Sequence, residues 1–323
     1  LVRMREDMLE RHGGSSIHGA IDADFTHLFS SWFNRGFLTL QRVDWNTPAS
    51  ILEKIIRYEA VHEIGSWDDL RRRLQPEDRR CYAFFHPQLP GEPLIFVEVA
   101  LTEDMPSAIA PLLRDEPAER PSRSPTHAVF YSISNCQKGM RGISFGNFLI
   151  KQVVEELRQE IPGLRHFVTL SPVPGFAAWL RGDPSTLPPA AGEVLKLVAT
   201  QEWAQDEAVR KRLCEILPPL AAGYFLSARM PDGRIIDPVA RFHLGNGASL
   251  ARINCFGDVS PKAIANQLGL MVNYRYELGE VEQNHERFAS EGEVVAEPAV
   301  SGLLAQRRTG LAGTWQRLSE ASS

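Results

Sequence analysis

Residues 130–176, FYSISNCQKGMRGISFGNFLIKQVVEELRQEIPGLRHFVTLSPVPGF, decide the fold. They begin inside an apolar, β-rich run, His127 to Ile133, that predicts a strand. From Phe145 the apolar residues recur at helical spacing, and Ile161-Pro162-Gly163 ends this helix. The apolar run from His166 to Leu170 predicts a second strand. A glycine-containing loop at a helix N-terminus is also a candidate anion site, because free N–H groups and the helix dipole attract phosphate.

Upstream of this stretch the sequence predicts helices first and then, from Phe37, alternating strands and helices. Residues 1–36 are predicted to be helical with one break, and Asp22 is expected to cap the second helix. A short basic helix follows. We favour a solvated face over a phosphate contact for its three arginines, Arg71, Arg72 and Arg73.

Two apolar β-type runs, 81–85 and 94–101, predict strands that a turn-rich segment joins. Glu98 interrupts the second run, and its spacing leaves open whether it faces solvent or a functional site.

A hairpin is predicted further along the chain. The segments 239–244 and 251–255 alternate apolar and polar residues, and Gly245-Asn246-Gly247 lies between them. His243 would then stand at the end of a strand, beside a tight turn.

Composition excludes several classes of partner. The chain has 323 residues, a formal net charge of −5 and a pI near 6.0, which does not favour nucleic acid. No apolar run reaches the roughly 18 residues of a membrane span. The start, LVRMREDMLERHGG, is too charged for a signal peptide, and its first residue, Leu1, suggests a missing upstream portion.

The cysteines predict a reduced, cytoplasmic protein. They are far apart in the sequence and form no CxxC pair, so we expect isolated thiols in place of a disulfide frame or a metal site. The four residues are Cys81, Cys136, Cys214 and Cys255.

Two sets of motifs carry a family resemblance. Arg141-Gly142-Ile143-Ser144-Phe145-Gly146 resembles a degenerate R/Q-x-x-G-x-G/A loop, with which GNAT acyltransferases cradle the pyrophosphate of coenzyme A. Ser144 stands where the first motif glycine usually lies. The segments GEPLIFVEVALT, FYSISNCQKGMRGISFGNFLIKQVVEEL, LSPVPGF and FHLGNGASLARINCFGDVS, in this order, resemble the malonyl-CoA decarboxylase family. The similarity runs from about Phe29 to about Tyr276.

The resemblance implies an α/β fold, with a GNAT-like mixed sheet flanked by helices and preceded by the end of an all-helical N-terminal domain. Residues 1–36 would be the C-terminal part of that helical domain, through which a homo-oligomer, dimer or tetramer, is expected. Residues 37–323 would form the GNAT-like catalytic domain, with a helical insertion near 183–222.

The resemblance also implies catalytic residues. Ser171 in LSPVPGF and His243 in FHLGNG match the family's catalytic serine and histidine. From the residues alone, a serine before a Pro-Xaa-Pro-Gly bend, which should expose its hydroxyl, is more often a turn residue, and a strand-end histidine is more often structural. Tyr276 in NYRYELG would polarise the thioester or hold His243, although a core tyrosine is an equal interpretation. Asn254 could shape the pocket.

The same resemblance assigns acyl-CoA binding to the residues of the glycine loop. These are Arg141, Gly142, Ile143, Ser144, Phe145, Gly146 and Asn147.

The implied reaction converts malonyl-CoA to acetyl-CoA and carbon dioxide through a thioester enolate that a histidine protonates. Neither a metal nor an organic cofactor is expected, because the thioester itself accepts the electrons. Two alternatives stay open: a GNAT-type acyltransferase that moves an acyl group from coenzyme A to an amine, and a non-catalytic acyl-CoA-binding protein.

Overall fold

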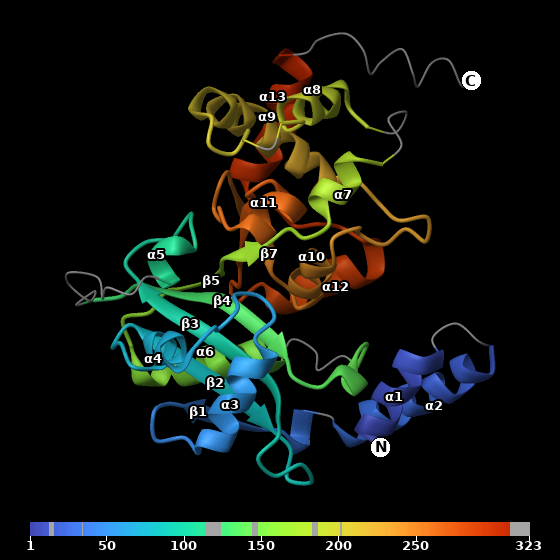
Figure 1. The fold of residues 1–323 in the computed structure, drawn as a ribbon, viewed down its shortest axis with the longest axis vertical. Helices are drawn as coiled ribbons and strands as arrows, with labels where there is room; N and C mark the ends of the chain where they lie inside the picture. The colour runs from blue at the N-terminus through green and yellow to red at the C-terminus, as the bar shows by residue number, and fades with distance from the viewer. Residues whose placement is uncertain are drawn as a thin grey trace. The chain divides into compact units, whose positions relative to one another are not determined.

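A computed structural model describes residues 1–12, 16–33, 35–113, 124–143, 148–182, 187–200 and 202–310. The chain forms two compact units: Leu1–Pro106 with Pro111–Val168, and Ser107–Ala110 with Thr169–Ser323. Figure 1 shows strands flanked by helices, after a helical N-terminal segment. The predicted α/β fold and the predicted helical start are therefore confirmed.

The first unit is a sheet with the strand order β1-β2-β3-β4-β5, preceded by two helices. Strands β1 to β4 pair antiparallel in sequence order. The strands are β1 (Thr39–Val43), β2 (Arg79–Phe85), β3 (Pro93–Thr102), β4 (His127–Asn135) and β5 (His166–Thr169). The helices are α1 (Val2–His12), α2 (Ser16–Trp32), α3 (Ala49–Tyr58), α4 (Trp67–Leu74) and α6 (Phe148–Glu160), with the 3-10 turns η1 (Arg35–Phe37) and η2 (Lys138–Met140); the short helix α5 (Ala110–Leu113) follows β3. The two predicted strands and the helix between them are thus confirmed, the helix from Phe148 onward; its predicted start at Phe145 lies outside the described residues.

The alternation of side chains along β2 explains why helices cover both faces of this sheet. Cys81 and Ala83 point into an apolar core with residues of α3 and α4. Arg80 and Tyr82 point to the other face, where both hydrogen-bond the carboxylate of Glu160 at the end of α6. Successive side chains of one strand therefore fix helices on opposite sides.

The N-terminal helices are anchored by a buried arginine. Arg5 of α1 donates to Asp22 Oδ1 at 2.7 Å, and to the backbone carbonyls of Gly139 and Arg141 at 2.9 Å each. The prediction that Asp22 caps a helix was wrong: α2 begins at Ser16, and Asp22 lies inside it, where it pairs with Arg5. Gly139 is required here, because a Cβ on it would lie 2.0 Å from the carbonyl oxygen of Val2.

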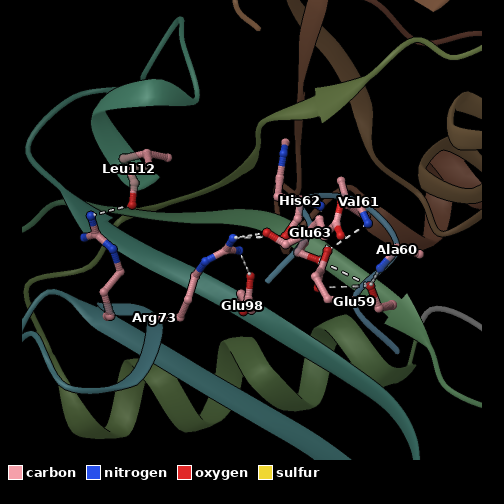
Figure 2. A network of polar contacts seen from close by, with 11 residues as sticks. Glu59, Ala60, Val61, His62, Glu63, Arg73, Glu98 and Leu112 are labelled. Atoms are coloured by element: carbon pink, nitrogen blue, oxygen red, sulfur yellow. Dashed lines mark hydrogen bonds and ion pairs between the residues drawn. The ribbon is translucent and has the colours of Figure 1, made fainter. Parts of the chain in front are cut away.

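The prediction that all three arginines of α4 are solvated was wrong for Arg73. Its guanidinium is buried, donates to Glu98 Oε2 at 2.8 Å and to the carbonyl of His62 at 2.9 Å, and lies in the polar network of Figure 2. Glu98 is fully buried on β3, so of the two alternatives that its spacing left open it does not face solvent. Burial raises the pKa of Glu98 to about 7, although the charge of Arg73 opposes this shift.

A second carboxylate of this network, Glu59, terminates α3. It accepts hydrogen bonds from the backbone N–H groups of Val61 and His62 and from the hydroxyls of Ser132 and Ser134 on β4. These bonds compensate for removing the carboxylate from water, and they tie the loop after α3 to the sheet (Figure 2).

The second unit has a small sheet in which β8 (Met271–Arg275) pairs antiparallel with both β6 (Ser171–Pro172) and β7 (Ser249–Asn254). Seven helices belong to this part of the described chain: α7 (Phe176–Leu180), α8 (Pro189–Leu197), α9 (Glu207–Leu226), α10 (Pro238–Gly245), α11 (Pro261–Gln267), α12 (Val281–Glu291) and α13 (Pro298–Gly310).

The predicted hairpin around Gly245-Asn246-Gly247 was wrong in its first arm. Residues Pro238–Gly245 form helix α10, whose N-cap Asp237 accepts from the N–H of Ala240 at 2.8 Å. Asp237 followed by Pro238 is a helix-start signal that outweighs the short alternating pattern. Gly247 has φ +83° and approaches Val281 so closely that a Cβ would lie 2.0 Å from its carbonyl oxygen.

The prediction of four isolated thiols was also wrong. Cys214 of α9 and Cys255, directly after β7, form a disulfide with their Cα atoms 5.5 Å apart. Sequence spacing gave no sign of it, because the two cysteines are 41 residues apart and meet only through the packing of α9 on β7. Cys81 and Cys136 are free and buried, as predicted for isolated thiols.

Candidate active site

Ser171 opens the short strand β6, which pairs with β8 opposite Val272. The strand end is fixed by the N–H of Val173, which donates to Gln267 Oε1 at 3.0 Å. The Pro-Xaa-Pro-Gly bend was expected to expose the serine hydroxyl, but Ser171 is only 5% exposed. The hydroxyl is therefore turned into the second unit.

His243 lies in the last turn of α10, not at a strand end. The carbonyl of His243 accepts from the N–H groups of Asn246 and Ala248 at 3.1 Å each, so the turn that follows the helix holds its backbone. The imidazole ring stacks on the ring of Tyr274, with the centroids 4.6 Å apart.

The three side chains proposed from the sequence meet in one hydrogen-bonded chain. Ser171 Oγ lies 3.1 Å from His243 Nε2, and His243 Nδ1 lies 2.8 Å from the hydroxyl of Tyr276. Segments that are 72 and 33 residues apart in the sequence thus converge on one imidazole. This contact places Tyr276 beside His243, and the role of Tyr276 stays a prediction.

Burial sets the protonation of the site. It lowers the pKa of His243 from 6.5 to about 3, so the imidazole is neutral at physiological pH. Burial also raises the pKa of Tyr276, which keeps its hydroxyl protonated. A neutral imidazole still has one N–H to donate and one nitrogen that accepts.

The sequence analysis did not identify the polar residues that contact Ser171 directly or through Thr169. Ser171 Oγ donates to Thr169 Oγ1 at 2.9 Å, and the side chain of Asn273 donates to the carbonyl of Thr169 at 2.7 Å. Asn254 Nδ2 in turn donates to Asn273 Oδ1 at 2.8 Å. Thr169 has a weak sequence signal, because residues two apart on an extended chain point to the same side. Asn273 has none.

The predicted acyl-CoA loop lies mostly outside the described residues. Arg141, Gly142 and Ile143 are described, whereas Ser144, Phe145, Gly146 and Asn147 are not. The described part is ordered by the backbone: the N–H of Arg141 donates to Lys138 and that of Ile143 to Met140. Phosphate binding by this loop stays a prediction.

The described residues hold neither a metal-binding cluster nor a membrane-spanning helix. Within the described ranges, no three His, Cys, Asp or Glu side chains come together in a way that could hold a metal ion. No helix in that part of the chain is both long and apolar enough to cross a membrane.

Two domain families match this chain. The malonyl-CoA decarboxylase N-terminal domain matches residues 1–33, and the malonyl-CoA decarboxylase C-terminal domain matches residues 36–313. Together these matches cover nearly the whole sequence.

Curated relatives agree with these matches. Mitochondrial malonyl-CoA decarboxylase of Anser anser anser is 38% identical over 339 residues, which cover 95% of this chain and 66% of the goose protein. The enzyme of Rattus norvegicus is 37% identical, with 95% and 68% covered. The chain thus spans about two thirds of the length of these relatives.

Solved structures resemble the chain more closely. Malonyl-CoA decarboxylase from Agrobacterium vitis has a TM-score of 0.88 and 59% identity, covering 94% of this chain and 75% of its own. The protein from Rhodopseudomonas palustris has a TM-score of 0.87 and 57% identity, covering 93% and 74%.

Proposed function

Because this chain belongs to the malonyl-CoA decarboxylase family, we propose that it converts malonyl-CoA to acetyl-CoA and carbon dioxide at Ser171, His243 and Tyr276. The observation that carries the proposal is the buried hydrogen-bonded chain through His243, with 3.1 Å to Ser171 and 2.8 Å to Tyr276. A proton donor beside a hydroxyl in a site shielded from water is what the reaction requires.

The reaction breaks the bond between the malonyl α-carbon and its carboxylate. Carbon dioxide leaves, and the electron pair moves into the thioester, which becomes an enolate. The α-carbon then takes one proton, so each turnover consumes one proton. No metal or organic cofactor is needed, because the thioester is the electron sink.

His243 supplies this proton from Nε2, the nitrogen that faces Ser171. As Nε2 loses its proton, Nδ1 takes the proton of the Tyr276 hydroxyl, which lies 2.8 Å away. Tyr276, which is 3% exposed, regains a proton from solvent between turnovers. A neutral imidazole that is backed by a phenol is a sufficient acid here, because the enolate carbon is a far stronger base than either group.

Ser171 does not act as a base. Its oxygen accepts from Nε2 of His243, 3.1 Å away, and so would keep the imidazole turned toward the carbon that takes the proton. The loop from Arg141 to Asn147 would bind the pyrophosphate of coenzyme A through backbone N–H groups.

The test is to incubate the purified chain with malonyl-CoA and to follow acetyl-CoA and carbon dioxide together. We expect equal amounts of both products. Succinyl-CoA is the control substrate, because its carboxylate lies one carbon further away and its loss gives no enolate. Acylation of an added amine without release of carbon dioxide would favour the acyltransferase, and binding without turnover would favour a non-catalytic protein.

A further inference from the structure

Thr169 precedes Ser171 by two residues, its hydroxyl contacts that of Ser171, and its side chain is fully buried. We propose that Thr169 is a positioning residue: by accepting the proton of the Ser171 hydroxyl, it fixes the tautomer of His243 that carries its proton on Nε2. The inference rests on the proposed function, because it is Nε2 that delivers the proton to the substrate.

The tautomer of His243 follows from the number of protons in the hydrogen bonds that run from Thr169 through Ser171 and His243 to Tyr276. A serine hydroxyl has one proton, and that of Ser171 goes to Thr169 Oγ1 at 2.9 Å. Ser171 Oγ can therefore only accept in its 3.1 Å contact with His243, so Nε2 must carry a hydrogen. A neutral imidazole has only one N–H. Nδ1 is then bare and accepts from the hydroxyl of Tyr276.

Thr169 is itself held by the neighbouring strand. The backbone N–H of Tyr274 donates to Thr169 Oγ1 at 3.1 Å, and Asn273 Nδ2 donates to the carbonyl of Thr169 at 2.7 Å. Asn273 is fully buried, and its own oxygen accepts from Asn254 Nδ2 on β7. The oxygen that receives the proton of Ser171 is thus fixed to the β7–β8 pair and cannot turn away.

Removing the oxygen of Thr169 would reverse the donor and acceptor roles in the hydrogen bonds that link Ser171, His243 and Tyr276. The hydroxyl of Ser171 would be free to rotate and donate to Nε2. The ring proton would then be on Nδ1 and would be donated to Tyr276. Nε2 would have no proton for the substrate, although every ring would keep its place.

The direct test uses the wild-type chain. The protein is labelled with ¹⁵N-histidine, and the signals of His243 are assigned by their loss in His243→Gln. We expect the proton on Nε2 at pH 7. A proton on Nδ1 would overturn the inference whether or not the chain decarboxylates malonyl-CoA, so its failure is distinguishable from failure of the proposed function.

Kinetics of Thr169 variants provide the second test. We expect Thr169→Val to lower kcat about 100-fold with little change in KM, and to shift the ¹⁵N signals of His243 toward the other tautomer. Thr169→Ser keeps the oxygen and should recover most of the lost rate. Thr39→Val, on an exposed position of β1, is the matched control and should behave as wild type.

Wild-type kcat in a folded Thr169→Val protein would contradict the inference, and so would an equal loss of rate in Thr169→Ser. If Thr169→Val does not fold, the tautomer of the wild-type protein and the rate of Thr169→Ser decide the question.

Discussion

His243 combines two properties that an exposed histidine does not have. It is buried with a neutral ring, and both ring nitrogens contact hydroxyl groups. In the proposed reaction the ring would therefore pass a proton without first becoming charged, and the same burial makes the free energy of unfolding depend on pH.

The first prediction concerns catalysis by His243. We expect His243→Ala to lower kcat for malonyl-CoA by about 10²–10⁴-fold, with the Kd of malonyl-CoA nearly unchanged, because the proton is delivered only during the reaction. Steady-state kinetics and calorimetry measure the two quantities. His285→Ala, which changes an exposed histidine on α12, is the control. Equal losses of binding and turnover would indicate a packing role for His243.

The second prediction concerns stability. In the unfolded chain the imidazole takes up a proton as the pH falls through 6.5, whereas in the folded chain it does so only near pH 3. The contribution of neutral His243 to the free energy of unfolding is thus fully present above pH 6.5 and is lost as the pH falls toward 3. Between these two pH values the free energy of unfolding falls by at most about 1.4 kcal/mol per pH unit.

Urea unfolding of wild type and His243→Gln at several pH values measures this effect. The difference between their free energies of unfolding should shrink below pH 6.5. Other titrating groups, such as Glu98, cancel in that difference. A constant difference between pH 4 and 7.5 would refute this account of the buried ring.

The sequence identified the candidate site residues that lie in recognisable motifs, but not those that act through distant contacts. Ser171, His243 and Tyr276 were found because they lie in recognisable motifs, although their catalytic roles stay predictions. Asn273 could not be found, because it acts through a contact with Thr169, 104 residues away. No local pattern encodes such a contact.

At the scale of elements, long periodic segments were predicted well and short ones poorly. Helix α6 and its flanking strands follow from apolar spacing, because their burial requires that spacing. The eight residues of α10 fit both a strand and a helix pattern, and only the Asp237-Pro238 start distinguishes them. The three arginines of α4 look alike in sequence, yet the 100° turn per residue sends one of them into the core.

Helix α4 therefore supplies a matched pair of variants. Arg73→Ala leaves the buried carboxylate of Glu98 without its cation, and we expect a loss of about 3–5 kcal/mol in the free energy of unfolding. Arg71→Ala removes a half-exposed side chain that pairs with Asp68 at 3.4 Å, and it should cost about 1 kcal/mol or less. Guanidinium unfolding compares the two. Similar losses would mean that the buried pair does not stabilise this unit.

At the scale of the whole molecule, a covalent link supplements the packing of the second unit. The disulfide between Cys214 and Cys255 closes a loop of about forty residues that contains α10 and β7. Such a loop restricts the unfolded chain, which corresponds to a stabilisation of about 4 kcal/mol.

We therefore expect dithiothreitol to lower the melting temperature of the wild-type chain. The double variant Cys214→Ser, Cys255→Ser should melt at the lower temperature with or without reductant. It is a suitable control because it keeps the two buried thiols, Cys81 and Cys136. A wild-type melting temperature that does not respond to the reductant, with a free thiol assay confirming reduction, would contradict this prediction.

The hydrogen bonds from Arg5 to the carbonyls of Gly139 and Arg141 join two segments that are far apart in the sequence. The first helix and the start of the predicted coenzyme A loop share one buried cation, with no space for a side chain between them at Gly139. A displacement of α1 would therefore also move the backbone at Gly139 and Arg141, where that predicted loop begins. If the loop binds coenzyme A as proposed, the affinity for the substrate depends on the position of a helix that contains none of the proposed catalytic residues.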